Sequence, residues 1–437
     1  MKRLLVFLFA AATAVSAQAA LHIQSWNLPN GARVLFVESR SIPLLDLSVE
    51  FDAGARRDPN GKAGVASMTN AMLARGITAG SDAQAEPALS EAQISDAFAD
   101  IAAQRGGGVG DDRGGLSLRT LSNATERERA VALLARLLAQ PSFPDDLLQR
   151  DKTRSIAALK EALTKPEVIA SRTFSQALYG THPYARESSV ESISALTRDD
   201  LLAFHRRYYV ANRAVVALIG AITREQADAI ARQLTERLPQ GAALPAMPPV
   251  PAAHAVEVRI AHPASQAHIL IGAPAIARSD PDFFALRVGN YTLGGGGFVS
   301  RLMQEVREKR GLAYSIYSGF SPLAQAGPFQ IGLQTKKEQA DEALKLVRAT
   351  LADFLRDGPT PTELKAAKDN LIGGFPLLID NNRKILDNIA MIGFYDLPLN
   401  YLDTWRDHVA KVTSADVKAA FARKIKLDTL STIVVGP

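Results

Sequence analysis

One pattern occurs twice in this chain, as TRDDLLAFHRRYYVANRAVVALIG at residues 197–220 and as TSADVKAAFARKIKLDTLSTIVVG at residues 413–436. Each copy opens with Thr followed three positions later by Asp, which predicts a helix capped by the Thr hydroxyl and favoured by a negative charge in its first turn. Each copy ends in an apolar, β-branched run that predicts a strand. The repeated order of helix and strand therefore predicts two homologous halves that arose by duplication.

A Pro- and Ala-rich run, PQGAALPAMPPVP at 239–251, lies between the two copies. Its prolines exclude a helix, so we predict an extended linker. A chain of 437 residues exceeds what one hydrophobic core usually supports. We expect an N-terminal domain over 20–238, a linker over 239–254 and a C-terminal domain over 255–437.

The N-terminus has the three parts of a secretory signal peptide. Lys2 and Arg3 precede an apolar run, and small residues follow at 17–19. We expect cleavage after Ala19 and a periplasmic location, with no membrane anchor, because the run is shorter than the roughly 20 residues of a transmembrane helix. The chain has no Cys, which excludes disulfides and a Cys nucleophile.

Each half combines alternating strand patterns with long helical patterns, which predicts an α+β fold in which an antiparallel sheet carries helices on one face. The Gly-rich segment 106–112 is predicted to be a mobile loop, because glycines weaken a strand. The predicted strands are 33–38, 45–51, 116–121, 268–272 and 329–333, and the predicted helices are 127–140, 151–179, 283–293 and 338–357.

Residues 292–315, TLGGGGFVSRLMQEVREKRGLAYS, closely resemble the C-terminal half of the pitrilysin/insulinase family of zinc metallopeptidases, in the mitochondrial-processing-peptidase-like subgroup. Segments 28–31, 52–58 and 179–184 are similar to the same family and follow its order. The resemblance covers nearly the whole mature chain. It implies two homologous α+β domains per chain, and two chains that close like a clamshell around a chamber for unfolded peptides.

The resemblance places the family's zinc-binding helix at 64–76, which by its residues alone is an amphipathic helix facing a core. The family's His-x-x-Glu-His falls on Ser67, Asn70 and Ala71, and its third ligand, a Glu, falls on Ala157 or Ala158. None of these side chains offers an imidazole, thiolate or carboxylate. We therefore expect no catalytic residue and no metal ligand in this chain.

The resemblance also implies that Arg307 and Tyr314 match an Arg and a Tyr that bind substrate and steady the reacting carbonyl. A guanidinium and a phenol suit that role, because both donate hydrogen bonds to a carbonyl oxygen and to the charge that grows on it. The residues alone also fit a solvated helix face followed by a partly buried aromatic side chain.

Other motifs predict structure rather than chemistry. Gly294 to Gly297 lack the Lys-Ser or Lys-Thr that follows a phosphate-binding loop, so we expect close backbone packing at a turn. No two histidines have the spacing of metal ligands, and we expect His182 to anchor a Pro-flanked turn.

The leading hypothesis is a non-catalytic, substrate-binding subunit of an exported heterodimeric zinc endopeptidase that acts on unfolded peptides. Its partner would be a homologous peptidase subunit that holds the zinc. The alternative is a peptide-binding or structural scaffold of the same fold with no proteolytic partner. We expect no nucleic-acid partner, because the formal net charge is only +5 and opposite charges are interspersed along the chain.

Overall fold

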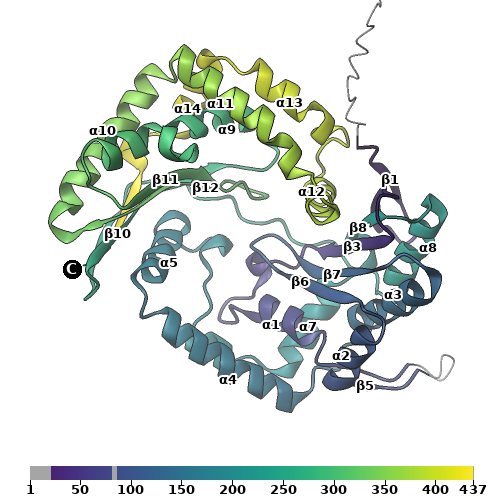
Figure 1. Cartoon of the computed structure of the whole chain (residues 1–437). Helices are drawn as coiled ribbons and strands as arrows, with labels where there is room; N and C mark the ends of the chain where they lie inside the picture. The colour runs from purple at the N-terminus through teal and green to yellow at the C-terminus, as the bar shows by residue number, and fades with distance from the viewer. Residues whose placement is uncertain (1–20, 81–85, 437) are drawn as a thin grey trace, which may run out of the picture.

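The computed structural model describes residues 21–80 and 86–436, so the expected signal peptide at 1–19 lies outside the described residues. The N-terminal half holds a six-stranded sheet in the order β1-β2-β8-β3-β7-β6 (Figure 1). Its strands are β1 (Gln24–Asn27), β2 (Arg33–Glu38), β3 (Leu44–Phe51), β6 (Gln104–Val109), β7 (Gly114–Leu121) and β8 (Val215–Gly220), with a separate pair β4 (Gly76–Ile77) and β5 (Leu89–Ser90). Its helices are α1 (Val65–Met72), α2 (Glu91–Ala99), α3 (Ala124–Ala139), α4 (Asp145–Ala162), α5 (Pro166–Tyr179), α6 (Val190–Ser194), α7 (Arg198–Tyr208) and α8 (Arg224–Thr235).

The C-terminal half holds a five-stranded sheet in the order β11-β12-β10-β13-β9. Its strands are β9 (Glu257–Ala261), β10 (Gln266–Ile276), β11 (Ser315–Phe320), β12 (Gly327–Lys336) and β13 (Ser431–Gly436). Its helices are α9 (Phe283–Asn290), α10 (Ala340–Asp357), α11 (Pro361–Gly374), α12 (Asn382–Phe394), α13 (Tyr401–Lys411) and α14 (Ser414–Lys424), with two π-helical turns at Tyr291–Gly295 and Met303–Glu308. The predicted α+β class with two such halves is confirmed.

The repeated sequence pattern forms the same unit in both halves. At α7, Thr197 accepts a hydrogen bond from the Asp200 N–H, and the Asp200 carboxylate accepts one from the Thr197 N–H. Thr413 and Asp416 form the same reciprocal cap at α14. The strand that follows each helix, β8 or β13, lies inside its sheet between one parallel and one antiparallel neighbour. Local capping and an apolar strand thus define the duplicated unit.

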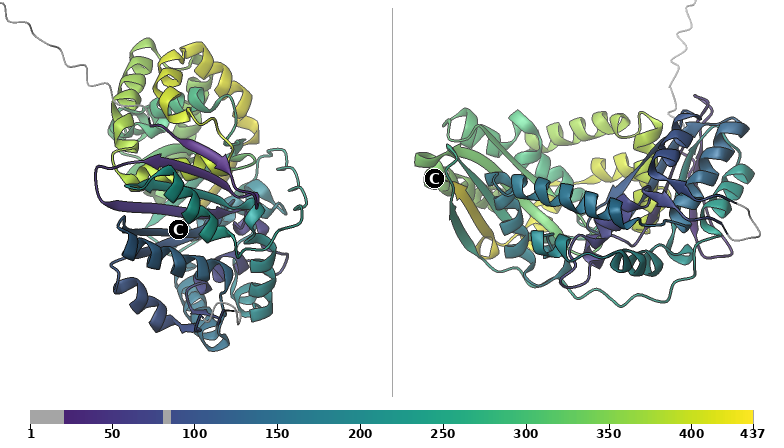
Figure 2. Two further views of the ribbon diagram at one scale, coloured as in Figure 1. Left: turned by 90° about the vertical axis from the view of Figure 1, so that its right-hand side faces the viewer. Right: turned by 90° about the horizontal axis from the view of Figure 1, so that it is seen from below.

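Each half sends one helix to the sheet of the other half, which the sequence did not predict (Figures 1 and 2). Helix α12 packs on β8 and β3, where Gly393 lets the helix approach β2 so closely that a Cβ would lie 2.4 Å from Leu35 Cδ1. Helix α5 packs on β13 and β10, where Phe174 shares a buried cluster with Ile433. Both faces of each sheet are therefore covered, and the two halves share apolar cores.

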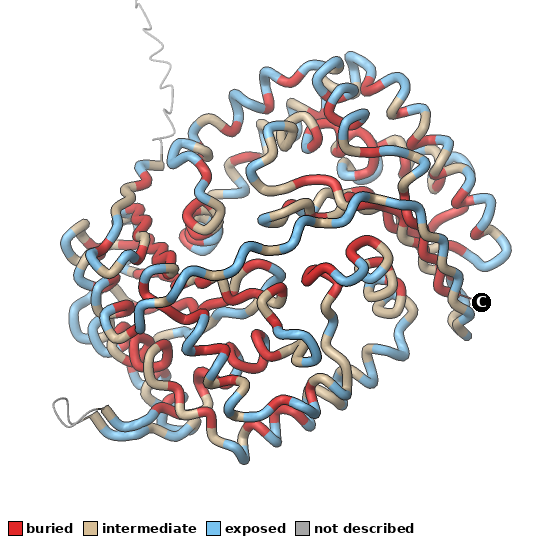
Figure 3. Tube along the Cα trace, turned by 180° about the vertical axis from the view of Figure 1, so that it is seen from behind, coloured by how far each residue is buried: buried red, intermediate tan, exposed pale blue. Residues whose placement is uncertain are grey.

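The linker runs extended along the back of the molecule, as the prolines predict (Figure 3). It is held against the N-terminal half by side chains. Arg57 Nη1 donates to the Pro245 carbonyl at 3.4 Å, and His182 Nε2 lies 3.0 Å from the Pro248 carbonyl. His182 is buried and its Nδ1 accepts the Tyr184 N–H, so this histidine is structural, in line with the expectation.

The single helix predicted over 151–179 is wrong. The chain forms two helices there, α4 and α5, and α5 begins at Pro166. Proline has no N–H to continue the first helix, and it forces the preceding Lys165 into an extended conformation with φ −96° and ψ 125°. The break is what allows α5 to leave the N-terminal half and reach the other sheet.

The mobile loop predicted over 106–112 is wrong for 106–109, because residues 104–109 form the edge strand β6, paired antiparallel with β7, and only 110–112 lie in the turn that follows. One of the glycines, Gly107, is required by this pairing. Gly107 has φ +127°, and a Cβ there would lie 2.3 Å from the Gly115 carbonyl oxygen. Glycine thus allows a close approach between backbones that any side chain would block.

None of the helices within 21–80 and 86–436 is long and apolar enough to cross a lipid bilayer.

Candidate functional site

Helix α1 starts where a buried carboxylate meets its first backbone amides. Asp58 accepts hydrogen bonds from the N–H groups of Gly64 at 2.6 Å and Ala66 at 2.8 Å, and Gly64 takes φ +101° to begin the helix. Burial raises the pKa of Asp58 to about 6, although these two amides act in the opposite direction. The cap fixes which face of α1 packs on the core and which faces solvent.

The outer face of α1 lines a cavity of about 390 Å³ that also involves α4. Ser67 and Ala71 project from α1 and are exposed, and Ser155 and Ala158 contribute from α4. Ala157 is exposed but is not among the lining residues. The structure thus brings Ser67 and Ala71 together with Ala158, and of the two candidates for the third position it favours Ala158.

Asn70 does not belong to this cavity. Its side chain lies on the flank of α1 next to the face that lines the cavity and is buried, and its Nδ2 donates to the Gly115 carbonyl at 3.0 Å and to the Tyr209 hydroxyl oxygen at 3.1 Å. The amide therefore fastens α1 to the strand β7 and to the end of α7. A carboxylate in its place would face the same carbonyl oxygen with no proton to donate.

The residues present do not fit a zinc ion. Ser67, Ala71 and Ala158 offer a hydroxyl and two methyl groups, whereas a catalytic zinc takes three imidazole, thiolate or carboxylate ligands. Asp151 is the only carboxylate among the cavity's lining residues, and it already pairs with Arg75 at 2.8 Å and Arg150 at 3.0 Å. In the described ranges, no group of three His, Cys, Asp or Glu side chains is placed to hold a metal.

Arg307 and Tyr314 lie together in a second cavity, of about 430 Å³, in the C-terminal half. The Arg307 guanidinium lies 5.9 Å from the centre of the Tyr314 ring and 4.9 Å from that of Phe298. Both rings are exposed, Tyr314 by 74% and Phe298 by 61%. A guanidinium within 6 Å of two exposed aromatic rings is attracted to both, which helps to hold it at the surface of the protein.

Two irregular segments position this pair. Residues 303–308, which carry Arg307, form a π-helical turn, and the Tyr314 N–H then donates to the Gln334 carbonyl, which joins the chain to β12. The Gly-rich run packs closely as expected, because a Cβ on Gly294 would lie 2.5 Å from Ser318 Oγ. These contacts place Arg307 and Tyr314 on one surface beside the edge strand β11.

The α1 cavity and the Arg307–Tyr314 cavity have no lining residue in common. Apart from Asn70 and Ala157, which lie outside both cavities, the structure brings the members of each set together, but it does not join the two sets in one cavity.

The comparisons with known proteins agree with this geometry. A family model described as the peptidase M16 inactive domain matches residues 195–371. A crystal structure of a peptidase M16 inactive domain from Pseudomonas fluorescens is 40% identical, with a TM-score of 0.90, and the match covers 95% of this chain and 98% of that chain. The chain belongs to the peptidase M16 family.

Two curated relatives of this M16 protein carry different descriptions. The non-peptidase homolog YmxG of Helicobacter pylori is 29% identical over 315 residues, which are 71% of this chain and 72% of that protein. An uncharacterized zinc protease of Streptomyces coelicolor is 33% identical over 277 residues, which are 60% of this chain and 59% of that protein. This M16 chain has a first-domain helix without zinc ligands.

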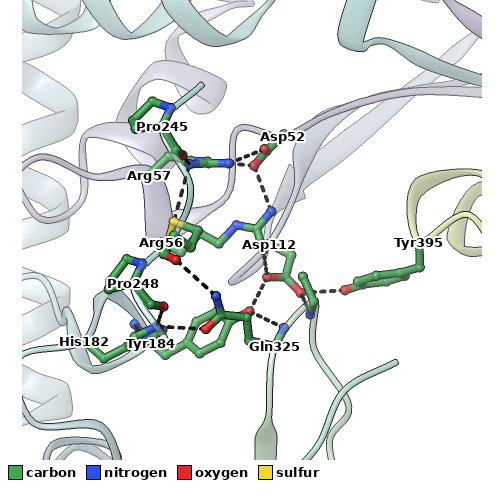
Figure 4. Close-up of polar contacts among 12 residues, drawn as sticks. Asp52, Arg56, Arg57, Asp112, His182, Tyr184, Pro245, Pro248, Gln325 and Tyr395 are labelled. Atoms are coloured by element: carbon green, nitrogen blue, oxygen red, sulfur yellow. Dashed lines mark hydrogen bonds and ion pairs between the residues drawn. The ribbon is translucent and has the colours of Figure 1, made fainter. Parts of the chain in front are cut away.

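A buried polar network joins the two halves of the M16 chain, and sequence reasoning missed it (Figure 4). Asp112 Oδ1 accepts from Arg56 at 2.5 Å and from the Tyr184 hydroxyl at 2.7 Å. Its Oδ2 accepts from the Ala324 N–H at 2.7 Å and the Tyr395 hydroxyl at 2.8 Å, both from the C-terminal half. In the sequence, Asp112 stands out only because it follows another aspartate, Asp111, after a Gly-rich run, and this pattern does not predict a buried network.

Proposed function

We propose that this chain is the non-catalytic, substrate-binding subunit of an exported heterodimeric zinc endopeptidase that acts on unfolded peptides. A homologous partner would supply the zinc and the general base. One observation carries the proposal: the Arg307–Tyr314 pair is assembled at an exposed surface, while α1 has no metal ligand and lines a separate cavity. A chain that has the substrate-binding pair but no zinc ligands can contribute to catalysis only if another chain supplies the zinc-binding helix.

Among the described residues, Arg307 makes only weak contacts through its guanidinium, including one from Nη1 to Met303 Sδ at 4.0 Å, so it can also bind a substrate carbonyl. Its closest carboxylate in the described chain is Glu308, at 3.8 Å and on the same turn, with the Glu308 side chain 44% exposed. Such an exposed pair is weak in water. The guanidinium and the Tyr314 hydroxyl can then donate to the oxygen of a scissile peptide bond, where negative charge grows during hydrolysis.

The edge strand β6 supports a role in holding the peptide backbone. It pairs with β7 on one side and ends the sheet on the other. An extended peptide can add to such an edge through main-chain hydrogen bonds. Because β6 is a strand and not the loop that the sequence predicts, its backbone is already extended for such pairing.

The test uses the full mature chain purified with a homologous chain from the same genome that carries His-x-x-Glu-His. We expect the two to form a complex that cleaves an unstructured fluorogenic peptide, with activity lost to chelator, whereas this chain alone does not cleave it. In the complex, Arg307→Ala should lower kcat/KM about 100-fold, as the loss of one oxyanion donor does elsewhere. Tyr314→Phe should lower it in the same direction.

Arg356→Gln is the matched control, because Arg356 lies on the surface of α10, paired with Asp353 and Asp357. This variant should cleave as the wild-type complex does. If Arg307→Ala and Tyr314→Phe also cleave normally, the pair has no part in catalysis. If no complex forms with any zinc-bearing homologue, the scaffold alternative replaces the proposal.

A further inference from the structure

A cavity of about 530 Å³ lies between the two halves, beside the Asp112 network. The N-terminal half contributes the turn between β6 and β7, which includes Arg113. The C-terminal half contributes the end of β10 with Arg278, the helix α9 with Arg287, and Tyr395 after α12. The cavity is distinct from the α1 cavity and the Arg307–Tyr314 cavity, with which it shares no lining residue.

Three guanidinium groups line this cavity, together with the carboxyl groups of Asp111 and Asp112. Within the described ranges, Arg113, Arg278 and Arg287 have no carboxylate oxygen within 4.0 Å, whereas Asp112 beside them is occupied by Arg56. Arg278 donates to the Pro322 carbonyl, but its Nε has no hydrogen-bond partner, and neither has Arg113 Nη1.

The charges in this cavity are costly as they stand. Burial is the main cause that lowers the pKa of Arg287, and the like charge of Arg278 acts in the same direction. Asp111 also lines the cavity, and burial together with its neighbour Asp112 raises the pKa of its carboxyl. An added anion would offset the repulsion between Arg278 and Arg287, because unpaired charges that are partly removed from water are unfavourable.

Part of the remaining wall is apolar, which limits the kind of anion. Beside the polar Asn290, Ser321 and Tyr395, the lining includes aliphatic and aromatic side chains, namely Ile276, Phe283, Leu286, Phe320 and Leu323. A cavity with a few polar groups in an apolar wall is typical of sites for small organic ligands. A bare inorganic anion would leave this apolar surface without contacts.

We propose that the cavity binds a carboxylate carried on an apolar body, with Arg113 from one half and Arg278 and Arg287 from the other around the carboxylate. The carboxylate can belong to a small free acid or to the C-terminus of a short peptide that ends in an apolar residue. Because the ligand would contact both halves, its binding would stabilise their present arrangement. The proposal does not depend on the Arg307–Tyr314 pair or on a zinc-bearing partner.

The test measures binding to the full mature chain by calorimetry and by the shift in Tm. One arm compares 4-phenylbutyrate with its neutral amide, a second compares the peptide Ala-Ala-Phe with its C-terminal amide, and a third uses inorganic phosphate. We expect an acid to bind and raise Tm, and its amide and phosphate to do neither. Whichever arm binds more tightly identifies the source of the carboxylate.

Arg287→Gln should weaken binding of the acid at least about tenfold, because a charge-assisted contact is lost. Arg287 makes no side-chain hydrogen bond or ion pair in the described chain, so this variant should fold, which its unliganded Tm and circular dichroism check. Arg113→Gln should have the same effect from the other half, and Arg356→Gln should have none. Equal binding of acid and amide, or wild-type affinity in both cavity variants, would overturn the proposal.

Discussion

The Tyr395 hydroxyl donates a 2.8 Å hydrogen bond to Asp112 Oδ2, although the two residues are 283 positions apart in the sequence. Tyr395 follows α12, the helix that the C-terminal half sends to the first sheet. Asp112 lies at the turn from β6 to β7, and the same carboxylate pairs with Arg56. One buried side chain therefore fixes the edge hairpin, the exchanged helix and the interface between the halves.

Asp112→Asn should destabilise the protein by about 3 kcal/mol, because it leaves the buried Arg56 with one carboxylate, Asp52, in place of two. Urea unfolding followed by circular dichroism measures the change. Tyr395→Phe removes a single hydrogen bond to a charged acceptor and should cost about 1.5–3 kcal/mol. A change below about 0.5 kcal/mol in Asp112→Asn would show that the network adds no stability.

The duplicated unit was predictable because its causes are local. The cap between Thr197 and Asp200 spans three residues, and the apolar run of β8 needs no knowledge of its neighbours to be identified as a strand. The exchange of α5 and α12 was not predictable, because it depends on which of two similar apolar sheets each helix covers. The sequence did not predict the β6 strand, because glycine has a low strand propensity. The glycine at 107 is explained only by the close approach of the β7 backbone, which is not visible in the local sequence.

The candidate site was predictable only in part. The resemblance gave Ser67 and Ala71, and the helical period places these two on one face. It did not decide whether Ala157 or Ala158 matches the third zinc ligand, because that depends on how α4 packs beside α1. The burial of the Asn70 side chain depends on its hydrogen bonds to Gly115 and Tyr209. Both partners are distant in the sequence, so the sequence alone did not predict this contact.

His205 should make the protein less stable in mild acid. It is buried with Nε2 at 2.7 Å from the Leu138 carbonyl, and burial lowers its pKa to about 4 from the ordinary 6.5. Because the unfolded chain takes up a proton below pH 6.5 and the folded chain does not, stability falls as pH decreases from 6.5 towards 4. Between about pH 7.5 and about pH 5, this group should account for a loss of about 2 kcal/mol.

The measurement compares chemical unfolding of the wild type and His205→Gln at the two pH values. Glutamine cannot take up the proton, so the stability of this variant should fall about 2 kcal/mol less over the same range. His254→Gln, at an exposed histidine of the linker, is the control and should follow the wild type. Parallel curves for wild type and His205→Gln would contradict the prediction.

Two glycines of β6 should respond differently to substitution. Gly107→Ala places a side chain at φ +127° and 2.3 Å from the Gly115 oxygen, so it should lower the free energy of unfolding by about 1–3 kcal/mol. Gly108→Ala, in the next position, meets nothing within 4 Å and should change it by less than about 0.5 kcal/mol. Thermal unfolding of both variants tests whether β6 is the strand described above; similar effects at both positions would indicate that it is not.

Restoring the family's zinc ligands at the positions that the resemblance assigns to them should create a zinc site in the α1 cavity. Ser67→His and Ala71→His place two imidazoles four positions apart on the exposed face of α1, and Ala158→Glu adds a carboxylate from α4 in the same cavity. Three such ligands with one open position are what a catalytic zinc takes. The triple variant should retain one zinc per chain after dialysis, measured by elemental analysis.

The matched control replaces Ala158→Glu by Ala157→Glu, whose side chain starts outside the lining of the cavity and should leave only weak zinc binding. Neither variant should cleave a peptide, because Asn70 cannot act as the general base. Adding Asn70→Glu should not repair this without a loss of stability, since Asn70 donates to Gly115 and Tyr209 in the core. If only the variant with Ala157→Glu bound zinc tightly, the family's third zinc ligand would correspond to Ala157 and not to Ala158.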